Sequence, residues 1–128
     1  MAGELILIVE DNEKNRKLER DILQFHGYRT VEAETGEDGV TLAQASPPAL
    51  ILMDIQLPGI DGYAALEQIR GNRATTHIPV IALTAFAMDG DRDRVLSSGF
   101  DGYMEKPISV RDFPTEVRRH LHEAERRH

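Results

Sequence analysis

The sequence predicts an α/β fold in which helices cover both faces of a five-stranded parallel sheet. Apolar runs at 5–9, 50–53 and 80–83 are continuous rather than alternating, which is typical of strands buried on both faces. Segments with helical periodicity separate these runs, so strands and helices alternate along the chain. Because crossovers between parallel strands are right-handed, this order favours a doubly wound sheet.

Two further strands complete the predicted sheet. Residues 28–33 are more polar and alternate, with Val31 and Ala33 on one face, so we expect an edge strand there. Residues 102–105 form the last strand, which is short and leads into a lysine and a proline.

Five helices are expected between and after the strands. The first follows Asn12, a good N-cap, and carries Leu18, Ile22 and Phe25 at helical spacing until Gly27 stops it. The others are expected at 36–45, from Tyr63 to near Gly71, at 89–98 with Gly99 as a C′ glycine, and around Phe113, Val117 and Leu121.

Pro114 leaves two possible starts for the last helix. If the helix starts at Ser109, the proline lies past the first turn, where it removes a hydrogen bond and clashes with the preceding turn. If Asp112 caps the helix instead, Pro114 falls in the first turn, where proline is tolerated. Both starts are compatible with the sequence.

The composition indicates one acidic, soluble domain. The chain has 128 residues, 41% of them hydrophobic and 29% charged, with a formal net charge of −7. That length suits a single domain over 1–128, and the negative charge with scattered basic residues argues against nucleic-acid binding. No apolar stretch approaches the roughly 20 residues that cross a bilayer, and cysteine is absent. We therefore expect a cytoplasmic protein that binds no membrane.

Polar and charged residues follow four of the expected strands where each strand ends. Glu10 and Asp11 come after the first strand, Asp54 after the third, Thr84 after the fourth and Lys106 after the fifth. If these strands are parallel neighbours, their carboxyl ends share one edge of the sheet, where ligand sites form in open α/β sheets. The sequence therefore predicts one pocket with three carboxylates, a hydroxyl and an ammonium.

Four motifs accompany these strand ends. They are Glu10-Asp11-Asn12, the segment 53–62 around Asp54, Leu83-Thr84-Ala85 and Lys106-Pro107. In this order and spacing they resemble the receiver domain of bacterial two-component response regulators, over essentially the whole chain. The stretches 7–13, 84–88 and 106–110 are most similar to the single-domain, DivK-like subgroup. The resemblance implies the sheet order 2-1-3-4-5 of flavodoxin-like and CheY-like folds.

For the pocket, the resemblance implies phosphoryl transfer to an aspartate. Asp54 corresponds to the phosphoacceptor, and a carboxylate can act as the nucleophile that forms an aspartyl phosphate. The family's donor is a phosphohistidine on a histidine kinase or a histidine phosphotransfer protein. Lys106 is expected to pair with the phosphoryl oxygens and Thr84 to donate its hydroxyl to one of them. Lys106-Pro107 resembles a site in the family where the peptide bond before the proline is cis, so the resemblance implies a cis bond here.

The carboxylates also predict a metal site. Two unit charges about 4 Å apart repel by about 4 kcal/mol at an effective dielectric constant of about 20, so a hard cation is expected among them. Mg²⁺ fits, because it keeps several waters and bridges carboxylates to phosphoryl oxygens. By resemblance, Asp11, Asp54 and the backbone carbonyl of Gln56 ligate it directly, and Glu10 acts mostly through water.

Further positions match places where the family switches and tunes its signal. Tyr103 corresponds to an aromatic switch residue that turns inward when phosphate draws Thr84 towards it; a half-buried packing residue is the alternative. Phe86 and Met88 lie in an apolar loop that serves either loop packing or partner docking. Gln56 and Phe86 stand two residues beyond the phosphoacceptor and Thr84, where the family tunes the loss of phosphate.

These features predict a phosphorelay switch rather than a turnover enzyme. We expect it to catalyse its own phosphorylation and slow hydrolysis, and to bind a downstream effector protein as a monomer or weak dimer. A phosphohydrolase of the haloacid-dehalogenase class needs a second aspartate two residues after the nucleophile, where this chain has Gln56. A receiver-like interaction module that is never phosphorylated is the alternative. Met1 and the subgroup resemblance favour a stand-alone protein over a fragment of a hybrid kinase or larger regulator.

Overall fold

The computed structural model, which describes residues 3–85 and 91–126, contains a five-stranded parallel sheet of order β2-β1-β3-β4-β5. The strands are β1 Leu5–Val9, β2 Arg29–Ala33, β3 Leu50–Asp54, β4 Val80–Thr84 and β5 Gly102–Glu105. Their pairing keeps the carboxyl ends close to level, with Val9 opposite Met53 and Asp54 opposite Leu83. The predicted fold class and strand order are confirmed.

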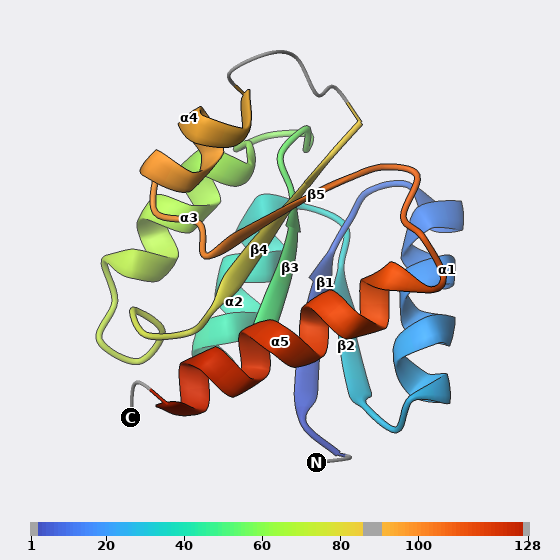
Figure 1. Cartoon of the computed structure of the whole chain (residues 1–128). Helices are drawn as coiled ribbons and strands as arrows, with labels where there is room; N and C mark the ends of the chain where they lie inside the picture. Colours follow the sequence, from blue (N-terminus) through green and yellow to red (C-terminus); the bar gives the residue numbers. More distant parts are fainter. Residues whose placement is uncertain (1–2, 86–90, 127–128) are drawn as a thin grey trace.

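The helices lie on both faces of this sheet (Figure 1). They are α1 Glu13–Phe25, α2 Gly36–Ala45, α3 Gly62–Arg70, α4 Asp91–Ser97 and α5 Asp112–Arg126. In β1, Ile6 and Ile8 pack with residues of α1 and α5, whereas Leu7 and Val9 pack with residues of α2, α3 and α4. This explains why the central strands are apolar at every position. Within the described residues, no helix combines the length and apolarity that a bilayer crossing requires.

The C-terminal end of α4 and the start of α5 agree with the ends expected from the sequence. Gly99 after α4 has φ +109°, in the left-handed region that favours glycine. The predicted start of α4 at residue 89 lies outside the described residues. Helix α5 begins at Asp112, so Pro114 lies in its first turn, as in the second of the two predicted starts. Asp112 is the first helical residue rather than the cap, and its N–H donates to Ser109 Oγ at 3.1 Å.

Helix α1 turns a different face to the sheet than its apolar spacing indicated. Ile22 is buried, but Leu18 and Phe25 are 37% and 86% exposed. The buried face consists of Glu19, Ile22 and Leu23. These three positions follow the i, i+3, i+4 spacing of a helix face equally well, and they include an acid where an apolar residue is usual.

That acid is Glu19, whose side chain lies in the core between α1 and the sheet. Its side chain is 1% exposed, and among the described residues its Oε1 atom has no hydrogen-bond partner. Burial raises the pKa of Glu19 to about 8; the charge of Glu10 adds to the increase and that of Lys106 opposes it. At neutral pH the folded protein therefore holds a proton on Glu19 that the unfolded chain has released.

Because the folded state holds this proton to higher pH than the unfolded chain, we expect the free energy of unfolding to fall as pH rises. Because the folded pKa lies above the unfolded value of 4.5, the contribution is complete below the unfolded value and is lost as pH rises through about 8. The slope is at most about 1.4 kcal/mol per pH unit. Glu19→Gln removes this titration, so its unfolding free energy relative to wild type should increase across that range in urea titrations. Parallel pH profiles of the two proteins would contradict this expectation.

Candidate functional site

The structure brings the five pocket residues to the carboxyl edge of the sheet. Glu10 and Asp11 follow β1, Asp54 ends β3, Thr84 ends β4 and Lys106 follows β5. Carboxylate oxygens of Glu10, Asp11 and Asp54 lie within 4.8 Å of one another. Asp11 is exposed, whereas the other two carboxylates are buried. The pocket is therefore a largely buried acidic centre with one carboxylate facing solvent.

Lys106 pairs with two of these carboxylates. Its Nζ atom lies 2.8 Å from Asp54 Oδ2 and 2.5 Å from Glu10 Oε1. The backbone N–H of Lys106 donates to Thr84 O at 2.8 Å, and the following bond to Pro107 is cis, as the resemblance implies. Burial favours the neutral amine, but the hydrogen bonds to Asp54 and Glu10 outweigh it and raise the pKa of Lys106. The side chain is therefore a firmly charged ammonium.

Both carboxylate oxygens of Asp54 accept hydrogen bonds from the protein, whereas Glu10 combines one hydrogen bond with an ion pair to Lys106. Besides Lys106, Glu10 accepts from Asn12 N–H at 3.1 Å, and Asp54 accepts from Gln56 N–H at 3.1 Å. Burial raises the pKa of Glu10 to about 7; Lys106 and the Asn12 N–H lower it, and Asp54 raises it further. One ammonium thus leaves the pocket with excess negative charge.

The donor set fits a hard divalent cation. Three carboxylates with oxygens within 4.8 Å carry more charge than one lysine offsets, and each ionised pair at that distance repels by about 3 kcal/mol at an effective dielectric constant of about 20. Carboxylate oxygens are the ligands that Mg²⁺ prefers. Since Asp11 is exposed, a cation can enter from solvent and keep part of its water shell.

Thr84 has a polar partner that no sequence pattern indicates. Its Oγ atom donates to the side-chain Oε1 of Gln56 at 3.2 Å, and Thr84 is 2% exposed. Gln56 therefore contacts Asp54 through its backbone and Thr84 through its side chain. A cavity of about 130 Å³ adjoins Gln56 and Thr84, with Tyr63 and Arg94 in its wall.

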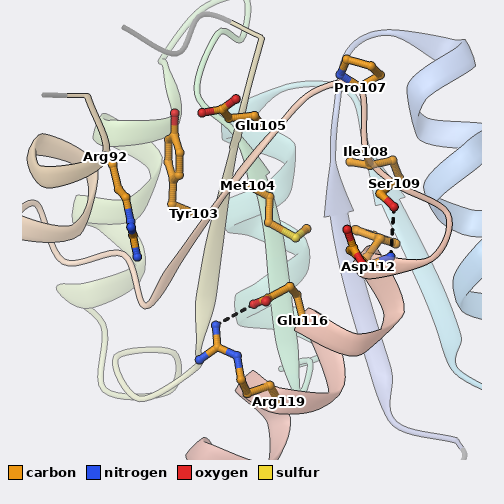
Figure 2. A pocket seen from close by; sticks show the side chains of 11 residues that line it. Arg92, Tyr103, Met104, Glu105, Pro107, Ile108, Ser109, Asp112, Glu116 and Arg119 are labelled. Atoms are coloured by element: carbon orange, nitrogen blue, oxygen red, sulfur yellow. Dashed lines mark hydrogen bonds and ion pairs between the residues drawn. The ribbon is translucent and has the colours of Figure 1, made fainter. Parts of the chain in front are cut away.

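Tyr103 stands on the outer strand β5, beside a larger cavity (Figure 2). It is half-buried, lies opposite Ala82 of β4 and packs against the core on the α3 and α4 face. The cavity has a volume of about 480 Å³ and is lined by side chains of α4, β5, α5 and the β5–α5 loop. Phe86 and Met88, predicted as tuning or docking residues, lie outside the described residues.

Arg16 of α1 also contacts the loop that carries Glu10 and Asp11, although no sequence pattern indicates this. Its guanidinium donates to the backbone carbonyl of Glu10 at 2.9 Å. In the sequence, Arg16 stands one turn after the acidic start of its helix, at Glu13. This arrangement is common on solvated helix faces, so it gives little indication of a contact with the pocket. Its partners become visible only when α1 is placed against β2.

Comparisons with known proteins match this architecture. The sequence profile of the response regulator receiver domain matches residues 6–118. The polar-differentiation response regulator DivK of Brucella ovis is 44% identical over 119 residues, which cover 93% of this chain and 97% of that protein.

Two solved structures are similar in fold and sequence. The receiver domain of a sensor histidine kinase from Pseudomonas aeruginosa, with a magnesium ion coordinated in its active-site cleft, is 37% identical with a TM-score of 0.86, over 94% of this chain and 98% of that one. A CheY-like receiver domain protein from Methanospirillum hungatei is 29% identical with a TM-score of 0.90, over 99% of this chain and 100% of that one.

Replacing Lys106 should show how much carboxylate repulsion it offsets. Without divalent metal, Lys106→Met should lower the unfolding free energy by about 1–3 kcal/mol, because it leaves buried carboxylates without their cation. Added Mg²⁺ should narrow that loss by supplying charge to the same pocket. Urea titrations with and without Mg²⁺ measure both effects.

Lys17→Met is the matched control for this experiment. Lys17 pairs with Asp21 at 2.7 Å on the surface, where its side chain is 65% exposed. Its loss should cost at most about 0.5 kcal/mol and should not respond to Mg²⁺. Equal losses in the two variants would refute the role assigned to Lys106.

Proposed function

This chain belongs to the response regulator receiver family, and we propose that it acts as a two-component or phosphorelay receiver that accepts a phosphoryl group on Asp54. The donor is a phosphohistidine on a histidine kinase or a histidine phosphotransfer protein. The proposal is carried by the position of Asp54: its buried carboxylate lies 2.8 Å from Lys106 inside a cluster of three carboxylates. A nucleophile beside an ammonium and a cation site suits attack on an anionic phosphoryl group.

In this proposal Asp11, Asp54 and the backbone carbonyl of Gln56 hold Mg²⁺. Glu10 acts mostly through water, as the resemblance to the family implies; its Oε1 atom forms an ion pair with Lys106 and its Oε2 atom accepts from the Asn12 N–H. The bound cation supplies charge neutralisation for the phosphoryl oxygens. The magnesium coordinated in the related Pseudomonas aeruginosa receiver domain supports this assignment.

The protein side chains divide the remaining work. An oxygen of Asp54 forms the new P–O bond as the P–N bond of the donor breaks. Lys106 then moves its ion pair from Asp54 to the phosphoryl oxygens, and Thr84 leaves Gln56 to donate to another of them. Lys106 already faces the Asp54 carboxylate and needs little reorganisation during transfer, whereas Thr84 must turn away from Gln56.

The same movement of Thr84 provides the output. As Thr84 turns towards the phosphoryl group, Tyr103 turns inward and changes the cavity between α4, β5 and α5 (Figure 2). A downstream effector protein then reads that surface. Gln56 occupies the position where a haloacid-dehalogenase-type hydrolase needs its acid, so the proposal is a switch that hydrolyses its own phosphate slowly rather than a turnover enzyme.

Intact mass spectrometry tests the phosphoacceptor. After incubation with Mg²⁺ and a small-molecule phosphodonor, wild type should gain one phosphoryl group and Asp54→Asn none, because the amide lacks the nucleophilic oxygen anion. Circular dichroism should show that the variant is folded. Uptake by Asp54→Asn would move the site elsewhere. No uptake by wild type, with either the small donor or a panel of phosphohistidine proteins, would favour an interaction module that is never phosphorylated.

A second experiment tests the Thr84 movement. Gln56→Ala removes one hydrogen-bond acceptor of the Thr84 hydroxyl, so switching by the phosphoryl mimic beryllofluoride should need about 2- to 10-fold less mimic, the equivalent of one hydrogen bond. The Tyr103 ring signals in NMR spectra report the transition. In a Thr84→Ala background the Gln56 substitution should have no effect. The same shift in both backgrounds would show that Gln56 acts by another route.

A further inference from the structure

The loop that carries Glu10 and Asp11 is held by a side chain from the next helix. Arg16 of α1 donates from Nη1 to the backbone carbonyl of Glu10 at 2.9 Å, and the same atom lies 3.5 Å from the carbonyl of Asp11. These are the two consecutive residues whose carboxylates enter the acidic cluster. One guanidinium nitrogen therefore contacts the backbone of both.

The other nitrogens of Arg16 reach the end of the edge strand β2. Nε lies 3.2 Å from Glu32 Oε1, and Nη2 lies 3.5 Å from Glu34 Oε1. The Arg16 side chain is 14% exposed and that of Glu32 26%, so their ion pair is partly sheltered from solvent, whereas Glu34 is 72% exposed. Figure 1 shows α1 beside the edge of the sheet that β2 forms. Arg16 thus joins the loop after β1 to the residues at the end of β2.

This arrangement uses what arginine has and lysine lacks. A planar guanidinium offers several donors in a fixed fork, so it can hold backbone carbonyls on one side and carboxylates on the other. The loop must keep two carboxylates close to Asp54 although all three repel one another. Outer contacts that orient metal ligands are typically worth about 10- to 100-fold in metal affinity.

We propose that Arg16 is a positioning residue for the divalent-cation site, which fixes the backbone of Glu10 and Asp11 so that their carboxylates face Asp54. This inference rests on the proposed function, because it assumes that the carboxylates hold Mg²⁺. It assigns Arg16 no contact with the cation or the phosphoryl group. Its loss therefore weakens cation binding and leaves the phosphoryl-transfer groups in place.

The chain provides a matched control in Arg20, one helical turn further along α1. Arg20 also pairs with Glu32, with Nη1 at 3.1 Å from both carboxylate oxygens. Among the described residues its guanidinium contacts the carboxylates of Glu32 and Asp21, and neither loop carbonyl. Arg20→Gln therefore removes a similar ion pair without touching the loop.

Titration calorimetry with Mg²⁺ on the full chain measures the effect directly. Arg16→Gln should raise the dissociation constant at least 10-fold, whereas Arg20→Gln should stay within about 2-fold of wild type. Arg16→Lys should also bind Mg²⁺ several-fold more weakly, because an ammonium keeps the charge but cannot bridge the carbonyls and carboxylates. This variant keeps the inference testable if Arg16→Gln does not fold. At saturating Mg²⁺, the rate of phosphorylation by a small donor should match wild type in every variant.

The outcomes separate this inference from the proposed function. Unchanged Mg²⁺ affinity in Arg16→Gln, or equal weakening in Arg16→Gln and Arg20→Gln, would overturn the positioning role. Full affinity in Arg16→Lys would also overturn it, because charge alone would then suffice. If wild type binds no Mg²⁺ and takes up no phosphoryl group, the proposed function itself fails.

Discussion

The main physical constraint on this structure is the excess of negative charge at the carboxyl edge of its sheet. Glu10, Asp11 and Asp54 bring carboxylate oxygens within 4.8 Å of one another, and Lys106 pairs with only two of them. The remaining imbalance explains why the site fits a divalent cation, and it adds to the burial that raises the pKa of Glu10 to about 7. In the proposed function, a phosphoryl group on Asp54 would add more anionic oxygens, which a bound cation, Lys106 and Thr84 would stabilise together.

The fold concentrates this charge by bringing distant segments to one edge. Asp54 and Lys106 are 52 positions apart in the chain, yet their side chains lie 2.8 Å apart because β3, β4 and β5 are consecutive parallel neighbours. The central strands β1, β3 and β4 are apolar on both faces, so this edge rests on a core packed from both sides. The loops above are fixed by local contacts: Asn12 caps α1 by accepting from Asn15 N–H at 3.0 Å, and Arg16 binds the carbonyl of Glu10.

The sequence was sufficient for the strands and for the membership of the pocket, because both follow from local signals. Continuous apolar runs identify buried parallel strands, and parallel strands necessarily collect their ends at one edge. It was insufficient where the outcome depends on how elements meet. The spacing of α1 supports two faces, and only its docking exposes Phe25 and buries Glu19. The Gln56–Thr84 hydrogen bond and the contacts of Arg16 join residues from separate elements, so no local pattern reveals them.

Anomalous X-ray diffraction from crystals of this protein grown with Mn²⁺ would test the central claim most directly, because manganese takes the same oxygen ligands as magnesium and marks its own position. We expect one strong peak among the carboxylates of Asp11 and Asp54 and the backbone carbonyl of Gln56, with Glu10 and Lys106 still paired nearby. A pocket without a peak, or a peak held by other surface acids, would contradict it, because the excess charge at the sheet edge would then serve some purpose other than cation binding.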